Sequence, residues 1–145
     1  MEKARAELVK YGKKLVTANL TKGTGGNLSV FDRANGTVAI TPSGIDFFEI
    51  EPEDIVILDL DGKVVEGDKL PSSEWEMHLM QYRTRDDIDA VIHAHIPGMV
   101  TNVDTIVMTA FELCTNSAQC VRSRFCLLVH LCTHNHVNII IKVEF

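Results

Sequence analysis

Residues 23–41 read GTGGNLSVFDRANGTVAIT, and this stretch decides how the first half of the chain folds. Its hydrophobic pattern predicts one strand over Leu28–Asp32 and a second over Thr37–Thr41. Asn35-Gly36 lies between them and is typical of a tight hairpin turn, because both residue types tolerate positive φ angles. The sequence therefore predicts an antiparallel hairpin that follows a glycine-rich loop.

An amphipathic helix is predicted upstream of this hairpin, over residues 3–20, with Gly23 as its terminator. The inward face of that helix consists of Leu8, Tyr11, Leu15 and Ala18. A second hairpin is predicted downstream, with strands Ile55–Leu60 and Lys63–Glu66 around Asp61-Gly62.

The segment after the second hairpin has the pattern of a helix followed by a strand. Ser73 with Glu76 three residues later fits a capping box, which opens a helix from Glu74 to about Arg83. Residues 88–95 then form a strand, with Val91, His93 and His95 on one face and Ile88, Ala90 and Ile92 on the other. The order helix, hairpins, helix and strand predicts an α/β layered domain with a largely antiparallel sheet.

Length and charge limit the classes of function. The chain has 145 residues, of which 46% are hydrophobic, so one domain with a sizeable core is expected. A net charge of −6 without a basic block argues against nucleic acid as a partner. No apolar run approaches the roughly 20 residues that span a bilayer, and no signal-peptide core follows the charged start, so a cytoplasmic location without membrane attachment is expected.

The composition changes near residue 100. Residues 1–100 contain all nine glycines and all four prolines. Residues 101–145 contain all four cysteines but no glycine or proline, the residue types that usually mark turns. A disulfide framework is not expected without a secretory signal. The chain is therefore divided into a functional part, 1–100, and a divergent tail, 101–145, which is interpreted as truncated or frameshifted rather than as an ordinary helical or strand-rich piece.

His93-Ala94-His95 is the strongest chemical signal. Two histidines on one face of a strand have Cα atoms roughly 6.6 Å apart, close enough to bind one metal ion. Neutral imidazole suits Zn²⁺, although Mn²⁺, Fe²⁺ or Co²⁺ are also possible. Glu74 is the best general-base candidate, four residues before His78 on the predicted helix. His78 itself is interpreted as a surface or half-buried helix residue.

Three short segments could bind an anion. The glycine loop that ends at Gly26 and Asn27 brings backbone N–H groups close to a ligand, although a plain turn is equally compatible. Ser43-Gly44 could contact phosphate oxygens, but an ordinary turn explains it as well. Ser72 and Ser73 lie at the predicted helix start, where backbone N–H groups are unpaired, and simple capping is the alternative.

Five segments in order resemble the class II aldolase/adducin family, over about residues 1–98. Any one of them is a weak signal, but their common order and spacing are highly specific. They are residues 23–29 (GTGGNLS), 40–44 (ITPSG), 59–67 (DLDGKVVEG), 71–74 (PSSE) and 93–95 (HAH). Within the family the motifs are most similar to those of the aldolases that act on L-fuculose 1-phosphate.

The resemblance implies a three-layer α/β fold with a central, mainly antiparallel sheet flanked by helices, assembled as a cyclic homotetramer. It implies a zinc-dependent lyase that cleaves a ketose 1-phosphate to dihydroxyacetone phosphate and an aldehyde through a zinc-stabilised enediolate. Glu74 would be the acid/base and, when no substrate is present, also a metal ligand together with His93 and His95. The substrate phosphate would be held by Gly26, Asn27, Ser43, Gly44, Ser72 and Ser73.

Other members of the same family leave alternatives open. Pentulose-phosphate 4-epimerases typically have Asp at the position of Glu74, and methylthioribulose-phosphate dehydratases are a further possibility. Adducin-type members are non-catalytic and lack the zinc histidines. The family's third zinc histidine, followed by glycine, has no counterpart here, and neither His130 nor a separate site built from Cys126, Cys132, His134 and His136 is favoured as a substitute.

Overall fold

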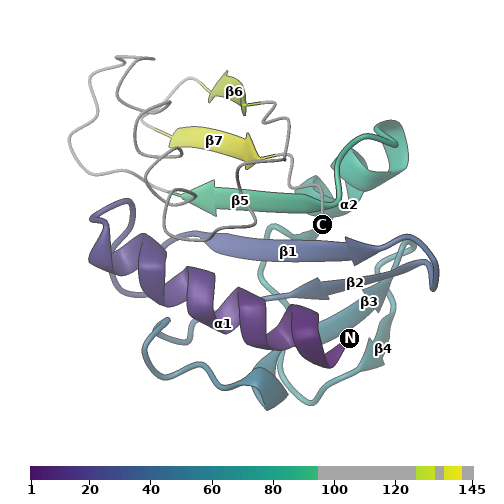
Figure 1. The fold of residues 1–145 in the computed structure, drawn as a ribbon, viewed down its shortest axis with the longest axis horizontal. Coiled ribbons are helices and arrows are strands. Elements are labelled where there is room, and N and C mark those ends of the chain that lie inside the picture. Colours follow the sequence, from purple (N-terminus) through teal and green to yellow (C-terminus); the bar gives the residue numbers. More distant parts are fainter. Residues whose placement is uncertain (95–126, 133–135, 142–145) are drawn as a thin grey trace.

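The computed structural model describes residues 1–94, 127–132 and 136–141, the last two ranges as backbone only (Figure 1). One long helix precedes two hairpins, and a second helix leads into the strand that carries His93. In chain order the elements are α1 (Glu2–Thr17), β1 (Asn27–Asp32), β2 (Thr37–Ile40), the short 3-10 helix η1 (Pro52–Asp54), β3 (Val56–Asp59), β4 (Val64–Glu66), α2 (Trp75–Thr84), β5 (Ala90–Ala94), β6 (Leu127–Cys132) and β7 (His136–Ile141).

The described strands form one sheet in the order β4-β3-β2-β1-β5-β7-β6. Every described pairing is antiparallel, which confirms the expected sheet type. Both hairpins are confirmed, with Gly36 at φ 65° and Gly62 at φ 87° in their turns. Strand β1 lies near the middle and pairs with both β2 and β5, so it connects the hairpins to the histidine strand.

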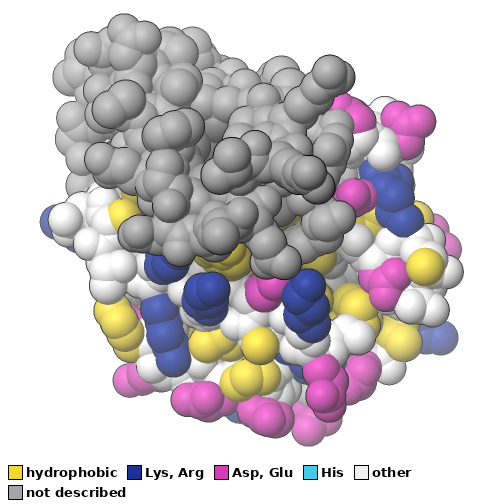
Figure 2. Space-filling view, viewed as in Figure 1, with side chains coloured by type: hydrophobic (Ala, Val, Ile, Leu, Met, Phe, Trp, Pro, Cys, Tyr) yellow, Lys and Arg dark blue, Asp and Glu magenta, His cyan; other side chains and the backbone are white. Residues whose placement is uncertain are grey.

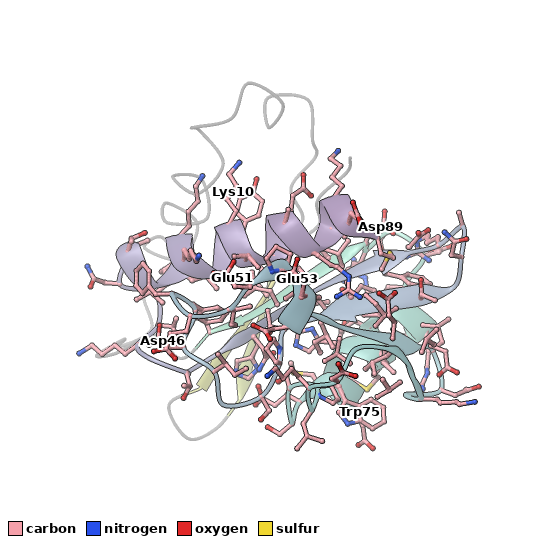
Figure 3. The ribbon with its side chains drawn as sticks, turned by 90° about the horizontal axis from the view of Figure 1, so that it is seen from below. Lys10, Asp46, Glu51, Glu53, Trp75 and Asp89 are labelled. Carbon is pink, nitrogen blue, oxygen red and sulfur yellow. The ribbon has the colours of Figure 1, made fainter. Side chains whose placement is uncertain are left out.

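The two long helices cover opposite faces of the sheet, which gives three layers. Leu8 and Leu15 of α1 pack with Leu28, while Tyr82 of α2 packs with Phe31 on the other face. Figure 3 shows the same division edge-on, with Lys10 of α1 and Trp75 of α2 on opposite sides of the sheet. The expected three-layer α/β architecture is therefore confirmed.

The end of α1 differs from its predicted terminator. The helix stops at Thr17, and Asn19 takes the left-handed conformation at φ 56°. The Asn19 N–H donates to the Val16 carbonyl and the Leu20 N–H to the Leu15 carbonyl, which satisfies the last turn. Gly23 lies beyond the helix end, so it was wrongly assigned as the terminator, and Ala18 is exposed rather than buried.

The start of α2 also differs from expectation. Its N-cap residue is Glu74, and no side-chain hydrogen bond caps it, so the predicted Ser73–Glu76 capping box is wrong. Trp75 holds this end by packing instead, because a Cβ on Gly62 would lie 2.1 Å from the Trp75 ring. The tight β3–β4 turn thus provides the space for the first residue of α2.

The predicted strand over residues 88–95 begins later than expected, at Ala90, and is described as far as Ala94. Ile88 lies before the strand and packs against α2 with Val91, while Ile92 faces α1. Ile88 was therefore wrongly assigned to the face of Ile92. His95 lies outside the described residues.

The surface carries mixed charge. Figure 2 shows basic and acidic side chains interspersed over the face that carries α1. Neither of the described α-helices combines the length and apolar character needed to cross a bilayer.

Candidate active site

Thr41 ties together the three segments that were predicted to bind phosphate. Its backbone N–H donates to the Leu28 carbonyl at 3.0 Å, and its hydroxyl accepts from the Leu28 N–H at 3.1 Å. Its carbonyl accepts from the Ser72 N–H at 3.0 Å. The start of β1, next to the glycine loop, the turn after β2 and the segment before α2 therefore meet around one buried residue.

The turn after β2 is held against the segment before α2 by further backbone contacts. The Ser43 N–H donates to the Leu70 carbonyl at 2.9 Å, and Pro42 forms an antiparallel bridge with Pro71. Ser43, Gly44 and Ser73 are exposed, whereas Ser72 is buried. The Ser72 hydroxyl accepts a long hydrogen bond, 3.4 Å, from the Glu74 N–H.

Gly26 approaches the histidine strand too closely for any side chain. Its φ is +81°, and a Cβ there would lie 2.5 Å from the His93 carbonyl oxygen. This close contact fixes the distance between the glycine loop and β5, next to Asn27, which is paired with His93 in the sheet register. The sequence identified Gly26 as part of a loop but could not show that β5 excludes a side chain there.

Glu74 and His93 lie side by side at the end of the sheet. The Glu74 Oε2 is 3.2 Å from the His93 Nδ1 and also accepts a 2.5 Å hydrogen bond from the Asn27 Nδ2. His93 is buried, whereas the Glu74 side chain is 36% exposed. The structure thus brings together three of the predicted site residues, with the carboxylate reachable from solvent.

His78 is fully buried, which overturns its interpretation as a surface or half-buried residue. Its Nε2 bonds to the Asn27 Oδ1, and its Nδ1 lies 2.6 Å from the Ser29 Oγ. Burial, and to a smaller extent nearby His93, lowers the pKa of His78 from 6.5 to about 3, so the imidazole is neutral at pH 7. It reaches Glu74 through Asn27 rather than by a direct side-chain contact.

Ser29 and Tyr82 extend this polar group and were missed by the sequence reasoning. The Ser29 Oγ is 2.6 Å from the Tyr82 Oη, and burial raises the pKa of Tyr82 above its ordinary value. A signal was available in principle, because His78 and Tyr82 are four residues apart and so share one helix face. Which strand residue that face would meet could not be read from the helix alone.

The family assignment follows from comparison with known proteins. The family model described as "Class II Aldolase and Adducin N-terminal domain" matches residues 6–124. The chain belongs to the class II aldolase and adducin family.

Two relatives of this chain are named as sugar-phosphate aldolases. It is 57% identical over 97 residues to a 5-deoxy-D-ribulose 1-phosphate aldolase from Bacillus thuringiensis, covering 67% of this chain and 46% of that protein. It is 42% identical over 93 residues to a 5-methylthioribulose-1-phosphate/5-deoxyribulose-1-phosphate aldolase from Rhodospirillum rubrum, covering 64% and 41%. The chain thus spans less than half the length of these two relatives.

A solved structure named L-fuculose 1-phosphate aldolase superposes with a TM-score of 0.64 and 69% sequence identity. The superposition covers 66% of this chain and 45% of that one. In the matched region the two proteins therefore share both the fold and most of the sequence.

The donors of the site suit a divalent metal ion. His93 offers an imidazole and Glu74 a carboxylate, both of which are common Zn²⁺ ligands. Within the described residues, no three side chains of His, Cys, Asp or Glu lie close enough to one another to hold a metal ion. His95, the further ligand expected from the resemblance, lies outside those residues, as do His134 and Cys126; His130, Cys132 and His136 are described as backbone only.

Proposed function

We propose that this protein is a metal-dependent aldolase that cleaves a ketose 1-phosphate to dihydroxyacetone phosphate and an aldehyde. One observation supports this above all: Thr41 joins the turn after β2 to Ser72 and to the start of β1, next to the glycine loop, while Asn27 at that start contacts Glu74 of the Glu74–His93 pair. A phosphate held there would place the sugar carbons next to a carboxylate. The names of the relatives point to the same class of substrate.

The phosphate group would be held mainly by short-range donors. Gly26, Asn27, Ser43, Gly44, Ser72 and Ser73 are the proposed contacts. Ser43, Gly44 and Ser73 are exposed, and the hydroxyls of the two serines and the backbone N–H of Gly44 are donors that suit phosphate oxygens. The side chain of Asn27 is already engaged with His78 and Glu74, so its role in this proposal includes orienting the carboxylate.

Glu74 is the proposed acid/base. In the cleavage direction the hydroxyl at C4 loses its proton, the C3–C4 bond breaks, and the C4 oxygen becomes the aldehyde carbonyl. The electron pair that remains at C3 must take up a proton to give dihydroxyacetone phosphate; in this proposal Glu74 accepts the proton of the C4 hydroxyl and then returns a proton to C3. The side-chain amide N–H of Asn27 would hold one oxygen of the Glu74 carboxylate in place during this transfer.

Zn²⁺ is the proposed cofactor, held by Glu74, His93 and His95, with Mn²⁺, Fe²⁺ or Co²⁺ as alternatives. When bound, the ion would supply positive charge against the negative charge that develops on the ketose oxygens. A cytoplasmic homotetramer and a divergent segment 101–145 remain predictions of the sequence analysis.

The test is an aldolase assay with three substrates: L-fuculose 1-phosphate, 5-deoxyribulose 1-phosphate and 5-methylthioribulose 1-phosphate. Dihydroxyacetone phosphate is measured by coupled reduction, with added Zn²⁺. We expect release from at least one of them, and a loss of about 100-fold or more in kcat for Glu74→Gln, which keeps the shape but removes the acid/base. Glu76→Gln, on the exposed side of α2, is the matched control and should be unaffected.

Two outcomes would contradict the proposal. Product that retains every carbon of the substrate, isomerised or dehydrated, would indicate an epimerase or dehydratase. A protein that binds neither metal nor phosphate analogue, and converts none of the three sugars, would indicate a non-catalytic module.

A further inference from the structure

Five side chains form a continuous chain of hydrogen bonds that ends at Glu74. Tyr82 bonds to Ser29, Ser29 to His78, His78 to Asn27, and Asn27 to Glu74. The first four side chains are buried, with exposures between 0% and 5%. These four residues belong to β1 and α2. The series of hydrogen bonds therefore crosses the interface between the sheet and the helix.

The direction of each hydrogen bond follows from the Glu74 end. A carboxylate offers only acceptors, so the Asn27 group that faces it must be the amide NH₂. The Asn27 carbonyl oxygen is then turned toward His78, and the His78 Nε2 must carry a proton to donate to it. A neutral imidazole has one N–H, which leaves the His78 Nδ1 as an acceptor.

The Tyr82 end of the chain is compatible with this direction. The Ser29 hydroxyl donates to the His78 Nδ1, and its oxygen then accepts from the Tyr82 hydroxyl. Every member thus has a donor matched to an acceptor, as buried polar groups require. The opposite direction would set the Asn27 carbonyl against the carboxylate, which is repulsive.

We propose that His78 is a positioning residue, held as its Nε2–H tautomer between Asn27 and Ser29. The Nε2–H of His78 supports the Asn27 amide in the orientation that turns its side-chain N–H toward Glu74. The Asn27 amide has two orientations of nearly equal shape, and the proton on the His78 Nε2 favours the same orientation as the Glu74 carboxylate does. His78 thereby holds the Glu74 Oε2 beside His93 without contacting the substrate.

The catalytic consequence rests on the proposed aldolase function. With the amide turned the other way, the Glu74 carboxylate would lose its N–H donor and face a carbonyl oxygen. Both its position beside His93 and its ability to move a proton would change. Residues that orient a ligand or an acid/base in this way typically account for about 10- to 100-fold in metal affinity or activity.

The first test measures the tautomer and needs no activity. Long-range ¹H–¹⁵N spectra of the purified protein at pH 7 distinguish an Nε2–H from an Nδ1–H imidazole and from imidazolium. We expect His78 to be the Nε2–H tautomer, assigned by its loss in His78→Gln. Ser29→Ala removes the donor to Nδ1 but leaves the Asn27 carbonyl oxygen facing Nε2, so the Nε2–H tautomer should persist in that variant. An Nδ1–H tautomer or an imidazolium in the unaltered protein overturns the inference.

The second test compares two substitutions of similar size. His78→Met has no hydrogen-bonding N–H and should lower kcat by about 10- to 100-fold with little change in KM. His78→Gln offers an N–H to Asn27 and a carbonyl to Ser29, and should recover most of that loss. Equal losses in both variants would show that His78 acts only by filling space, and would overturn the inference.

The two proposals fail in different ways. If the unaltered protein cleaves no ketose 1-phosphate, the aldolase function fails, and the tautomer measurement still decides the role of His78. If the protein is active but His78 carries its proton on Nδ1, the aldolase function stands and the positioning role is wrong. The tautomer measurement also decides the question if His78→Met does not fold.

Discussion

Gly26 is a single residue whose lack of a side chain sets the geometry of the site. Its left-handed φ of +81° is strained for any other residue, and a Cβ would also meet the His93 carbonyl at 2.5 Å. Gly23, in the same loop, has a similar φ of +57° but open space around its missing Cβ. The two glycines therefore separate the cost of the backbone conformation from the cost of the close contact.

We expect Gly26→Ala to lower the free energy of unfolding by about 2–5 kcal/mol, since backbone strain and a clash with β5 add together. Gly23→Ala should cost only about 1–2 kcal/mol, the strain alone. Denaturant unfolding of the two variants measures both values. Equal losses in the two variants would show that the approach of Gly26 to His93 does not constrain the fold.

Among single residues, the sequence identified which residues belong to the site better than it identified the environment of each one. Glu74, His93 and Asn27 were singled out, and the structure brings them together. The environment of His78 was misjudged, because four-residue spacing from Glu74 suggested a direct pair on an exposed helix. Its burial depends on how α2 lies against β1, which is a long-range contact that no local pattern encodes.

Among the elements, the junction of β1, β2 and the segment before α2 depends on one hydroxyl. The Thr41 Oγ1 is the acceptor for the Leu28 N–H at the start of β1. The Thr41 carbonyl binds the Ser72 N–H, so a shift of this residue would move two candidate phosphate-binding segments at once. A buried N–H left without an acceptor costs about 1–3 kcal/mol.

Thr41→Val keeps the shape of the side chain but removes this acceptor. We expect it to lower the free energy of unfolding by about 1–3 kcal/mol and to weaken binding of a phosphate analogue. Thr41→Ser retains the hydroxyl and should bind the analogue as the unaltered protein does. Chemical unfolding and calorimetric titration with phosphoglycolohydroxamate provide the two measurements. A Thr41→Val protein with unchanged stability would contradict this role of the hydroxyl.

The hairpins were predicted well because their signals are local. Asn35-Gly36 and Asp61-Gly62 specify turns whatever surrounds them, although only the glycine of each pair takes a positive φ. The helix ends were predicted less well. The end of α1 is set by Asn19 rather than Gly23, and the start of α2 by Trp75 packing on the β3–β4 turn. The latter is a contact between distant parts of the chain.

In the molecule as a whole, the site lies where the start of α2 meets one end of the β1–β5 pair, near the middle of the sheet. The layers were predictable because the alternation along β1 separates α1-facing from α2-facing residues, as Leu28 and Phe31 illustrate. The complete metal centre was not, because its expected ligands come from α2, from β5 and from His95 beyond it. A ligand set drawn from separate elements depends on the entire fold.

The proposed metal centre predicts how Zn²⁺ binding depends on individual histidines. We expect the metal-free protein to bind one Zn²⁺ per chain in calorimetric titration. His93→Ala and His95→Ala each remove a proposed ligand, so each should weaken binding by more than the roughly 10- to 100-fold loss that follows a change to a supporting residue. His136→Ala, on β7, alters a histidine with no proposed role in this site and should bind Zn²⁺ normally. Equal weakening by His136→Ala would make His136, next to the Val137 that pairs with Ala94, a further candidate ligand, and unchanged binding in His93→Ala would remove His93 from the proposed site.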